Sequence, residues 1–294
     1  MKYERPKPLS VVVPVHNMAG RMDNLNRWVA QISERDLPIE IILVQDGNDA
    51  GTFIELETLS KKYGCMFISV DVKSPGLARN AGIEVASGDY VSFWDADDLP
   101  LPENATEALS SFTSDLDVLV GSYEIFYISN KRDVALKESS YSEWLFNPGI
   151  WRMIFRKDFI GETRFSAARM GEDQLFLANL HLKSNQLKFL KSPIYRYFIG
   201  DFGQLTNSKE ALLDISNVLD EFSSIISTNP FVEDYIYTFF VRMTITELTK
   251  LKKFSVSLKR FIRLFFKISL KKKLRLAKNM LLVSLKIIFR KDSI

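Results

Sequence analysis

Several acidic side chains stand together directly after one hydrophobic run. Asp95, Asp97 and Asp98 follow Trp94, and in an extended stretch Asp95 and Asp97 point to the same side. Two carboxylates with no histidine beside them suit a hard cation such as Mg²⁺ or Mn²⁺, which bridges diphosphate oxygens and stabilises departing negative charge. An acidic turn that begins a loop or caps a helix has the same composition, so the pair alone leaves both interpretations open.

Composition narrows the chemistry available elsewhere in the sequence. The chain has a single cysteine, Cys65, and two histidines, His16 and His181. These counts exclude an intramolecular disulfide and a zinc site built from cysteine and histidine. Any metal must therefore be held mainly by oxygen. Hydrophobic residues at 46% and charged residues at 26% of the 294 residues are typical of a globular protein with a buried core.

The elements that position these carboxylates follow an alternating pattern. Residues 9–15 and 39–44 are β-branched runs typical of buried parallel strands, and residues 24–32 between them have the apolar spacing of a helix packed on one side. The alternation continues through a helix with Phe53, Leu56 and Leu59, a strand at 66–70, a helix at 76–86 and a strand at 90–94. This order predicts an α/β fold with a mostly parallel, doubly wound sheet.

Polar residues follow three of the predicted strands. His16 and Asn17 come after the first strand, Asp46 after the second, and Asp95 after the fourth. Ligands of such sheets bind outside the carboxyl ends of the strands. We therefore expect the three loops to face one crevice.

Four motifs in this region resemble the family 2 glycosyltransferases. They are VVPVHN at 12–17, DGN at 46–48, ARNAG at 78–82 and FWDADD at 93–98, and their order and spacing also match the family. The resemblance implies the glycosyltransferase-A fold and transfer of a sugar from a nucleoside diphosphate sugar.

The resemblance assigns roles residue by residue. Asp46 would accept a hydrogen bond from the nucleotide base, Asp95 would contact the ribose, and Asp97 would hold the metal, Mn²⁺ or Mg²⁺. His16 has the alternative of a solvated loop residue, and Arg79 that of an ion-pair partner of the acidic loops. The full predicted nucleotide site comprises Pro14, Val15, His16, Asn17, Asp46, Arg79, Asp95, Ala96 and Asp97.

An acceptor half is predicted further along the chain. Residues 170–176 (MGEDQLF) resemble the E-D-x-x-F segment of the family, which makes Asp173 the general base and predicts inversion at the anomeric carbon. The alternative is that Glu172 and Asp173 are acids that stabilise a helix start.

Two other segments have a functional and a structural interpretation. The resemblance places Gly149 and Trp151 near the acceptor, whereas a tryptophan is equally at home in a core. After Pro193, Gly200 and Gly203 are candidate hinges of a lid over the donor, or simply part of a surface connection.

The charge of the chain is divided very unevenly. Residues 250–294 contain 15 Lys and Arg and one acid, a formal charge of +14, which leaves −11 for residues 1–249 within a total of +3. Two amphipathic helices are predicted here, and neither apolar run is long enough to span a bilayer. In the first, the basic side holds Lys259, Arg260, Arg263 and Lys267, and the apolar side holds Phe254, Leu258, Phe261, Phe265 and Ile268.

The tail pattern favours helices that lie on an anionic membrane surface. A helical hairpin packed on the catalytic domain is the main alternative, and RNA binding is a third, for which the tail has no recognisable motif. No nucleic-acid partner is expected.

The sequence thus predicts a catalytic domain at 1–205 and a helical region with a basic tail at 206–294. The expected reaction is inverting transfer to an acceptor hydroxyl on a glycan or lipid-linked acceptor, in surface polysaccharide assembly, with UDP as the commoner family donor. The amino-terminal residues have no signal-peptide pattern, so we expect a cytoplasmic protein, peripheral on the inner face of the membrane. A nucleotidyltransferase would need a glycine-rich, lysine-bearing loop where residues 16–22 read HNMAGRM. A non-catalytic membrane-associated scaffold with the same fold is the other alternative.

Overall fold

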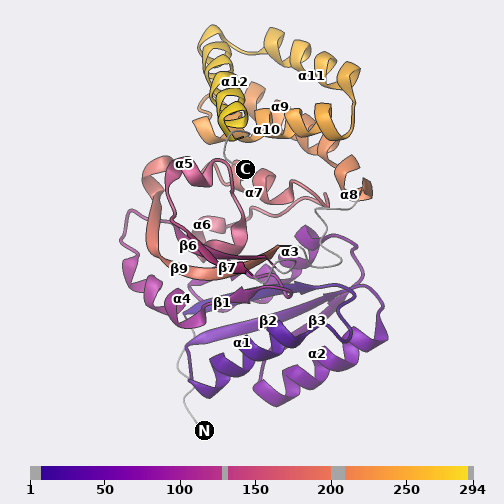
Figure 1. Ribbon diagram of the computed structural model, residues 1–294, viewed down its shortest axis with the longest axis vertical. Helices are drawn as coiled ribbons and strands as arrows, with labels where there is room; N and C mark the ends of the chain where they lie inside the picture. Colours follow the sequence, from indigo (N-terminus) through magenta and orange to yellow (C-terminus); the bar gives the residue numbers. More distant parts are fainter. Residues whose placement is uncertain (1–7, 128–131, 200–208, 291–294) are drawn as a thin grey trace. The chain divides into compact units, whose positions relative to one another are not determined.

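The computed structural model describes residues 8–127, 132–199 and 209–290 (Figure 1). Its contacts divide the chain into two compact units. The first comprises Met1–Ala167 and Asn185–Gln204, and the second Ala168–Ser184 and Leu205–Ile294. The predicted boundary at 205/206 lies next to Leu205, where the second part of the second unit begins, and falls outside the described residues. Residues 168–184 belong to the second unit, together with the helices after residue 208.

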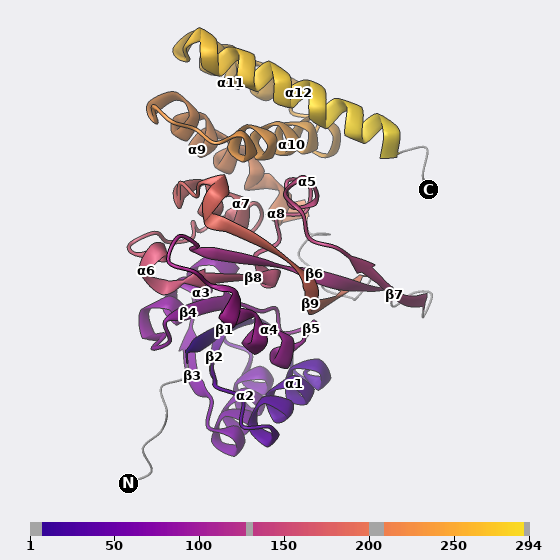
Figure 2. The ribbon, with the colours of Figure 1, turned by 90° about the vertical axis from the view of Figure 1, so that its left-hand side faces the viewer.

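The first unit is built on one nine-stranded sheet (Figures 1 and 2). Its order is β3-β2-β1-β4-β8-β6-β9-β5, and β7 pairs with β6. The strands are β1 Leu9–Val15, β2 Ile39–Asp46, β3 Met66–Val70, β4 Tyr90–Phe93, β5 Leu99–Pro100, β6 Val118–Tyr127, β7 Arg132–Lys137, β8 Met153–Arg156 and β9 Leu187–Ile199.

The two halves of the sheet differ in strand direction. β3, β2, β1 and β4 are parallel, as the alternation of strands and helices predicts. Beyond β4 the sheet is mixed: β8 is antiparallel to β4 and β6, β7 to β6, and β5 to β9, whereas β6 and β9 are parallel. Parallel neighbours need long crossover connections, and antiparallel neighbours can follow one another through short ones, as β6 and β7 do.

Helices cover both faces of the parallel half. α1 and α2 lie on one face and α3 on the other (Figures 1 and 2). α1 buries Leu25, Trp28, Val29 and Ile32, which is the predicted apolar stripe. The helical segments of this unit are α1 Asp23–Glu34, α2 Ala50–Tyr63, α3 Pro75–Val85, α4 Pro102–Ala108, α5 Tyr141–Trp144 and α6 Lys157–Ile160, with 3₁₀ turns at Leu109–Ser111 and Ile150–Arg152.

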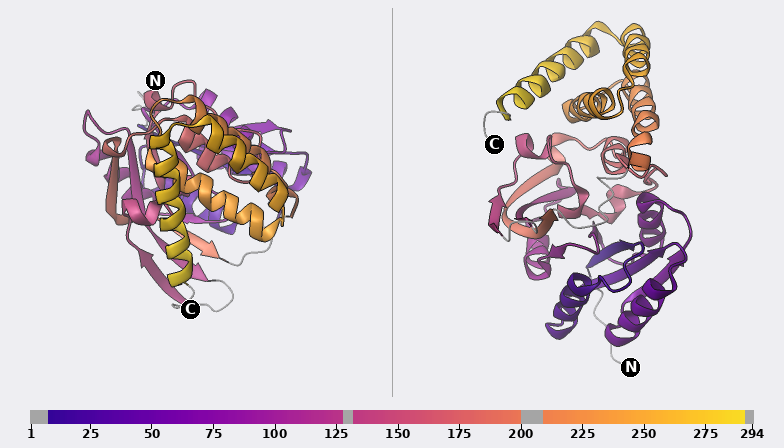
Figure 3. Two further views of the ribbon diagram at one scale, coloured as in Figure 1. Left: turned by 90° about the horizontal axis from the view of Figure 1, so that it is seen from above. Right: turned by 45° about the vertical axis from the view of Figure 1, so that its right-hand side comes forward.

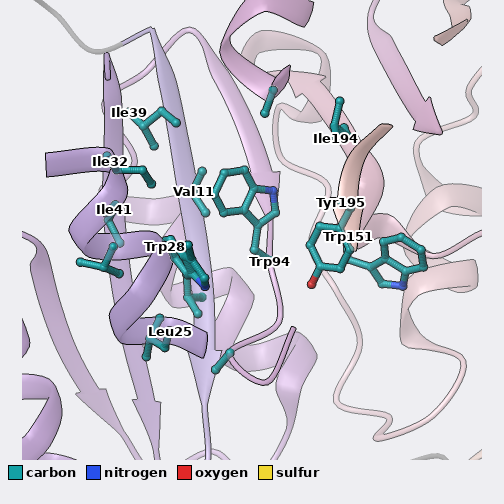
Figure 4. Close-up of a cluster of buried hydrophobic side chains, with 14 of the residues drawn as sticks. Val11, Leu25, Trp28, Ile32, Ile39, Ile41, Trp94, Trp151, Ile194 and Tyr195 are labelled. Carbon is teal, nitrogen blue, oxygen red and sulfur yellow. The ribbon is translucent and has the colours of Figure 1, made fainter. Parts of the chain in front are cut away.

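A hydrophobic core fills the space between α1 and the sheet. The Trp28 and Trp94 rings meet edge to face with centroids 5.3 Å apart, and both side chains are fully buried (Figure 4). Trp94 immediately precedes the acidic motif, so this packing holds the end of β4 in place.

The second unit is helical. Its helices are α7 Glu172–Asn179, α8 Lys209–Leu213, α9 Ile215–Thr228, α10 Asp234–Lys250, α11 Phe254–Lys267 and α12 Leu270–Arg290. A 3₁₀ turn at Ser184–Gln186 stands at the boundary between the two units. α11 and α12 form a layer on α9 and α10 (Figure 3). In the part of the chain that the structure describes, no helix is both long and apolar enough to cross a bilayer.

Arg260 corrects the predicted division of α11 into a basic and an apolar side. It was expected on the solvated basic side, but its side chain is only 6% exposed. Its Nη1 donates to Glu247 at 2.5 Å and its Nε to Asp220 at 2.6 Å. A buried carboxylate needs a charged partner, and this requirement turns the helix so that Arg260 faces α9 and α10.

Candidate active site

The acidic motif forms a turn in which exposure alternates along the chain. Asp95 and Asp97 are half-buried, whereas Ala96 and Asp98 between and after them are buried. Asp95 and Asp97 are therefore the two more accessible carboxylates of the motif, and that they act on one ligand stays a prediction.

Tyr195 on β9 and Asp98 hold this turn through hydrogen bonds. The Tyr195 hydroxyl donates to Asp98 Oδ2 at 3.1 Å and accepts from the Asp95 amide at 3.0 Å. Asp98 Oδ1 accepts from the amide of Phe198 at 2.8 Å. Burial, reinforced by the neighbouring charges of Asp97 and Asp95, raises the pKa of Asp98 well above its ordinary value. The Asp98 side chain is buried, and both of its oxygens accept hydrogen bonds from β9. It therefore positions the turn.

Two more side chains fix the turn from other elements. Asn24 on α1 donates to the Asp97 carbonyl at 2.8 Å. Arg79 on α3, which is buried, pairs through Nη2 with Asp95 Oδ1 at 3.2 Å and lies over the Phe165 ring. The predicted alternative of an ion pair between Arg79 and an acidic loop is the arrangement found.

Asp46 organises the loop that leads into α3. Its Oδ1 accepts from the amides of Val72 at 2.8 Å and Lys73 at 2.9 Å, and its Oδ2 from the amide of Ser74 at 2.8 Å. The residue is 5% exposed, so a hydrogen bond to a base would use the small accessible part of this carboxylate. Ser74 in turn caps α3 by accepting from the Leu77 amide.

Three residues of the ARNAG motif, Arg79, Asn80 and Gly82, have a physical reason in the structure. Asn80 donates to the Phe165 carbonyl at 2.9 Å and accepts from the Phe165 amide at 2.8 Å, so it pairs with that residue as a backbone strand would. Gly82 lies where an added Cβ would come within 2.2 Å of Val12 on β1. The close approach of α3 to β1 places Arg79 beside Asp95.

The loop after β1 meets the end of β2. His16 is exposed, and its Nδ1 donates to the Asp46 carbonyl at 2.6 Å. This hydrogen bond uses Nδ1 and not Nε2. Asn17 is also exposed and has a left-handed φ of 49°. Val15 is buried in the core and Pro14 is half-buried. At this edge of the sheet these two residues would therefore meet a ligand through their backbone atoms.

The residues present fit a metal that is held jointly by protein and ligand. Among the described residues, no group of three or more His, Cys, Asp or Glu side chains is arranged to hold a metal ion. Mg²⁺ and comparable ions commonly take one or two carboxylates and complete their shell with phosphate oxygens and water. Asp97, half-buried beside Asp95, has the chemistry and exposure for that role.

Asp173 belongs to the second unit, at the start of α7. It is half-buried in the first turn of the helix. Gly171 precedes it with φ 86°, and a Cβ there would come within 2.4 Å of the Met243 side chain. The left-handed backbone before α7 therefore favours glycine at this position.

Trp151 fits the second of its two interpretations, that of a core tryptophan. Its ring stacks on Tyr197 at an interplanar angle of 4° and packs against Tyr195 and Tyr123, and it is 8% exposed (Figure 4). Its burial among three aromatic rings makes Trp151 a core residue. Gly149 packs against it, and Gly200 and Gly203 lie outside the described residues.

Sequence reasoning missed four residues that shape the site: Asn24, Asn80, Asp98 and Tyr195. Asn80 is part of the ARNAG motif and Asp98 is part of the FWDADD motif, so membership of a motif was the signal that could have identified them. Tyr195 and Asn24 had none, because their partners are 100 and 73 residues away in the chain.

Comparison with known proteins agrees with this architecture. Residues 10–173 match the family model described as "Glycosyl transferase family 2". The glycosyltransferase GlyG of Streptococcus pneumoniae is 24% identical over 213 residues, which cover 64% of this chain and 70% of GlyG. The chain spans 52% of EpsH of Bacillus subtilis and 30% of GlyA of S. pneumoniae.

Solved structures share the fold at low identity. A structure of Staphylococcus aureus TarS 1–349 with UDP-GlcNAc has a TM-score of 0.65 and 18% identity, and covers 92% of this chain and 79% of that one. A mannosyltransferase of Pyrobaculum calidifontis with GDP-Man and Mn²⁺ has a TM-score of 0.54 and 12% identity, over 94% and 80%. By its motifs, its fold and the family model that matches more than half of its length, this chain belongs to glycosyltransferase family 2 and has the glycosyltransferase-A fold.

Proposed function

We propose that this enzyme transfers a sugar, with inversion, from a nucleoside diphosphate sugar to an acceptor hydroxyl, and that UDP is the nucleotide of its donor. The observation that carries the proposal is the Asp95–Asp97 turn, fixed by Tyr195 and Arg79, at the carboxyl end of β4. TarS, a relative with the same fold, was solved with UDP-GlcNAc, which supports the choice of UDP.

The donor half is proposed to lie wholly in the first unit. Asp97 would hold Mn²⁺ or Mg²⁺ and Asp95 would contact the ribose. Asp46 and His16, which are hydrogen-bonded to each other, would border the base. When bound, the metal would neutralise the diphosphate as it departs. This help is needed because residues 1–249 carry a formal charge of −11 and would otherwise repel a phosphate-rich ligand. Mn²⁺ in the mannosyltransferase structure supports the same choice of ion for this chain.

Asp173 is proposed as the general base. Its carboxylate would take the proton of the acceptor hydroxyl while the acceptor oxygen bonds to the anomeric carbon. The bond from that carbon to the β-phosphate oxygen breaks at the same time, and the nucleoside diphosphate leaves from the opposite face. One direct displacement gives a product of inverted configuration, which nuclear magnetic resonance of the first-formed product would reveal.

The acceptor is proposed to be a surface glycan or a lipid-linked glycan. TarS is a poly(ribitol-phosphate) β-N-acetylglucosaminyltransferase, and its relation to this chain, 26% identity over 203 residues, supports an acceptor of the cell-surface polymer class. The basic tail supports a place on the cytoplasmic side of the membrane, peripheral to it, where such acceptors are assembled.

Removal of the metal should abolish nucleotide binding. Titration calorimetry of the full chain with UDP, GDP and dTDP, each with Mn²⁺ and with EDTA, is expected to give binding of UDP that requires Mn²⁺. Binding of GDP or dTDP instead would mean that the donor carries that nucleotide and not UDP. Equal binding in EDTA would show that nucleotide binding does not need the metal. The absence of binding by any of the three would contradict the donor site itself.

Loss of the Tyr195 hydroxyl should loosen the acidic turn. Tyr195→Phe leaves the Asp95 amide and Asp98 Oδ2 without their bonds to this hydroxyl, and two such losses are expected to weaken Mn²⁺-dependent UDP binding about tenfold. Tyr90→Phe, at the other end of β4, is the matched control, because Tyr90 stacks on Phe112 away from the turn. Equal affinities in the two variants would show that the hydroxyl has no part in positioning.

A further inference from the structure

α11 buries one narrow side and leaves large apolar side chains exposed on another. The buried positions are Ser257, Arg260 and Leu264. Phe254, which is 67% exposed, and Leu258 lie on a different side of the helix. A helix of a globular protein ordinarily turns its apolar stripe to the core, so the exposure of these apolar side chains needs an explanation.

The exposed apolar residues of α11 form a continuous stripe. Phe254, Leu258, Ile262 and Phe265 recur at spacings of three and four residues, which places them on one side of the helix. Phe266 beside them is 80% exposed. Side chains of this size exposed along a whole helix mark a binding surface rather than ordinary surface variation.

α12 presents a second such stripe. Its buried positions include Leu276, Asn279 and Val283. Leucines at 270, 274, 281 and 285 follow the helical repeat on the opposite side, and Leu274 is 65% exposed. α11 packs on α9 and α10, and α12 packs on α10, while the residues of both stripes stay exposed.

Exposed basic side chains border both stripes. Lys259, Arg263 and Lys267 stand on α11, and Lys271 and Lys278 on α12. The stretch 250–294 has a formal charge of +14, so a second copy of the same surface would be strongly repelled. A nucleic acid would satisfy the charge but would leave the leucines and phenylalanines uncovered. An anionic bilayer satisfies both, since its headgroups attract the cations and its acyl region receives the apolar side chains.

We infer that the α11 and α12 stripes, with these basic residues, form a surface that docks on an anionic lipid bilayer. The inference rests on the proposed place of the enzyme at the membrane and names the residues that bind there. It also assigns Arg260 to the interior of the unit and removes it from the lipid-binding surface.

The test is flotation of the full chain with lipid vesicles. We expect binding to vesicles of equimolar phosphatidylcholine and phosphatidylglycerol, weakened by high salt, and little binding to phosphatidylcholine alone. Substitution of Phe254, Leu258 and Phe265 by serine should reduce binding at least about tenfold, because three apolar side chains no longer enter the bilayer. Replacement of Lys259, Arg263 and Lys267 by glutamine should abolish the preference for phosphatidylglycerol.

Phe231→Ser is the matched control, because Phe231 is 87% exposed but lies between α9 and α10. It should bind vesicles as the unchanged protein does. Equal binding by the triple serine variant, or equal binding to both vesicle types, would overturn the inference. A protein that does not bind vesicles but forms a dimer in sedimentation velocity, and whose dimer the serine substitutions dissociate, would also overturn the inference.

Calorimetry with UDP and Mn²⁺ on the same preparations separates this inference from the proposed function. Vesicle binding without nucleotide binding would contradict the proposed donor site and leave the docking surface standing. Nucleotide binding without vesicle binding would do the reverse.

Discussion

Asp173→Asn is expected to lower the rate of sugar transfer by about 10²–10⁴-fold, the usual contribution of a general base. Asparagine has nearly the same shape but cannot take the acceptor proton. Mn²⁺-dependent UDP binding should be unchanged, because the residues proposed to hold the donor do not include Asp173. Transfer rates and calorimetry on the same variant measure both quantities.

Glu172→Gln separates the catalytic role of Asp173 from a structural one. Both acids stand in the first turn of α7, where a negative charge stabilises a helix by about 0.3–1 kcal/mol. If helix stabilisation is their shared purpose, the two variants will lose similar stability and similar activity. A large loss of transfer confined to Asp173→Asn supports the base, and unchanged transfer in that variant would remove Asp173 from the mechanism.

Arg260→Ala is expected to destabilise the helical unit by about 3–5 kcal/mol, since it leaves a buried carboxylate without its charged partner. Glu247 is fully buried and accepts hydrogen bonds from Ser216 at 2.6 Å, from Ser257 and from Arg260. Urea unfolding followed by circular dichroism measures the loss. Arg263→Ala, on the same helix but exposed, should change stability by less than about 0.5 kcal/mol.

The effect of Arg260 should depend on pH in a defined direction. Burial opposes the charge on Glu247, but hydrogen bonds from two serines and from Arg260 outweigh it and lower its pKa. A group with a lowered pKa contributes stability above its unfolded pKa, about 4.3 for glutamate, and loses it as the pH falls through the folded value. The difference between Arg260→Ala and the unchanged protein should therefore shrink below about pH 4. A difference that stays constant down to pH 3 would contradict the ion-pair explanation.

The parallel half of the sheet was accessible to sequence reasoning because its signals are local. The predicted strands 9–15 and 66–70 coincide with β1 and β3, and the predicted apolar stripe at 24–32 is the buried side of α1. A strand buried on both faces, as β1 is, is a run of β-branched residues, and a helix packed on one side repeats every three to four residues. Both patterns are contained in a few consecutive residues.

The sequence by itself determined the family, the parallel core of the fold and the acidic turn with its Asp95 and Asp97 spacing. Only the tertiary structure decided which groups hold that turn, because Tyr195 reaches Asp98 and Asp95 from a strand about 100 residues away. It also decided that Arg260 turns inward. Amphipathic periodicity states that a helix has two different sides, but the side that is buried depends on the partner it meets, and here that partner is the carboxylate of Glu247.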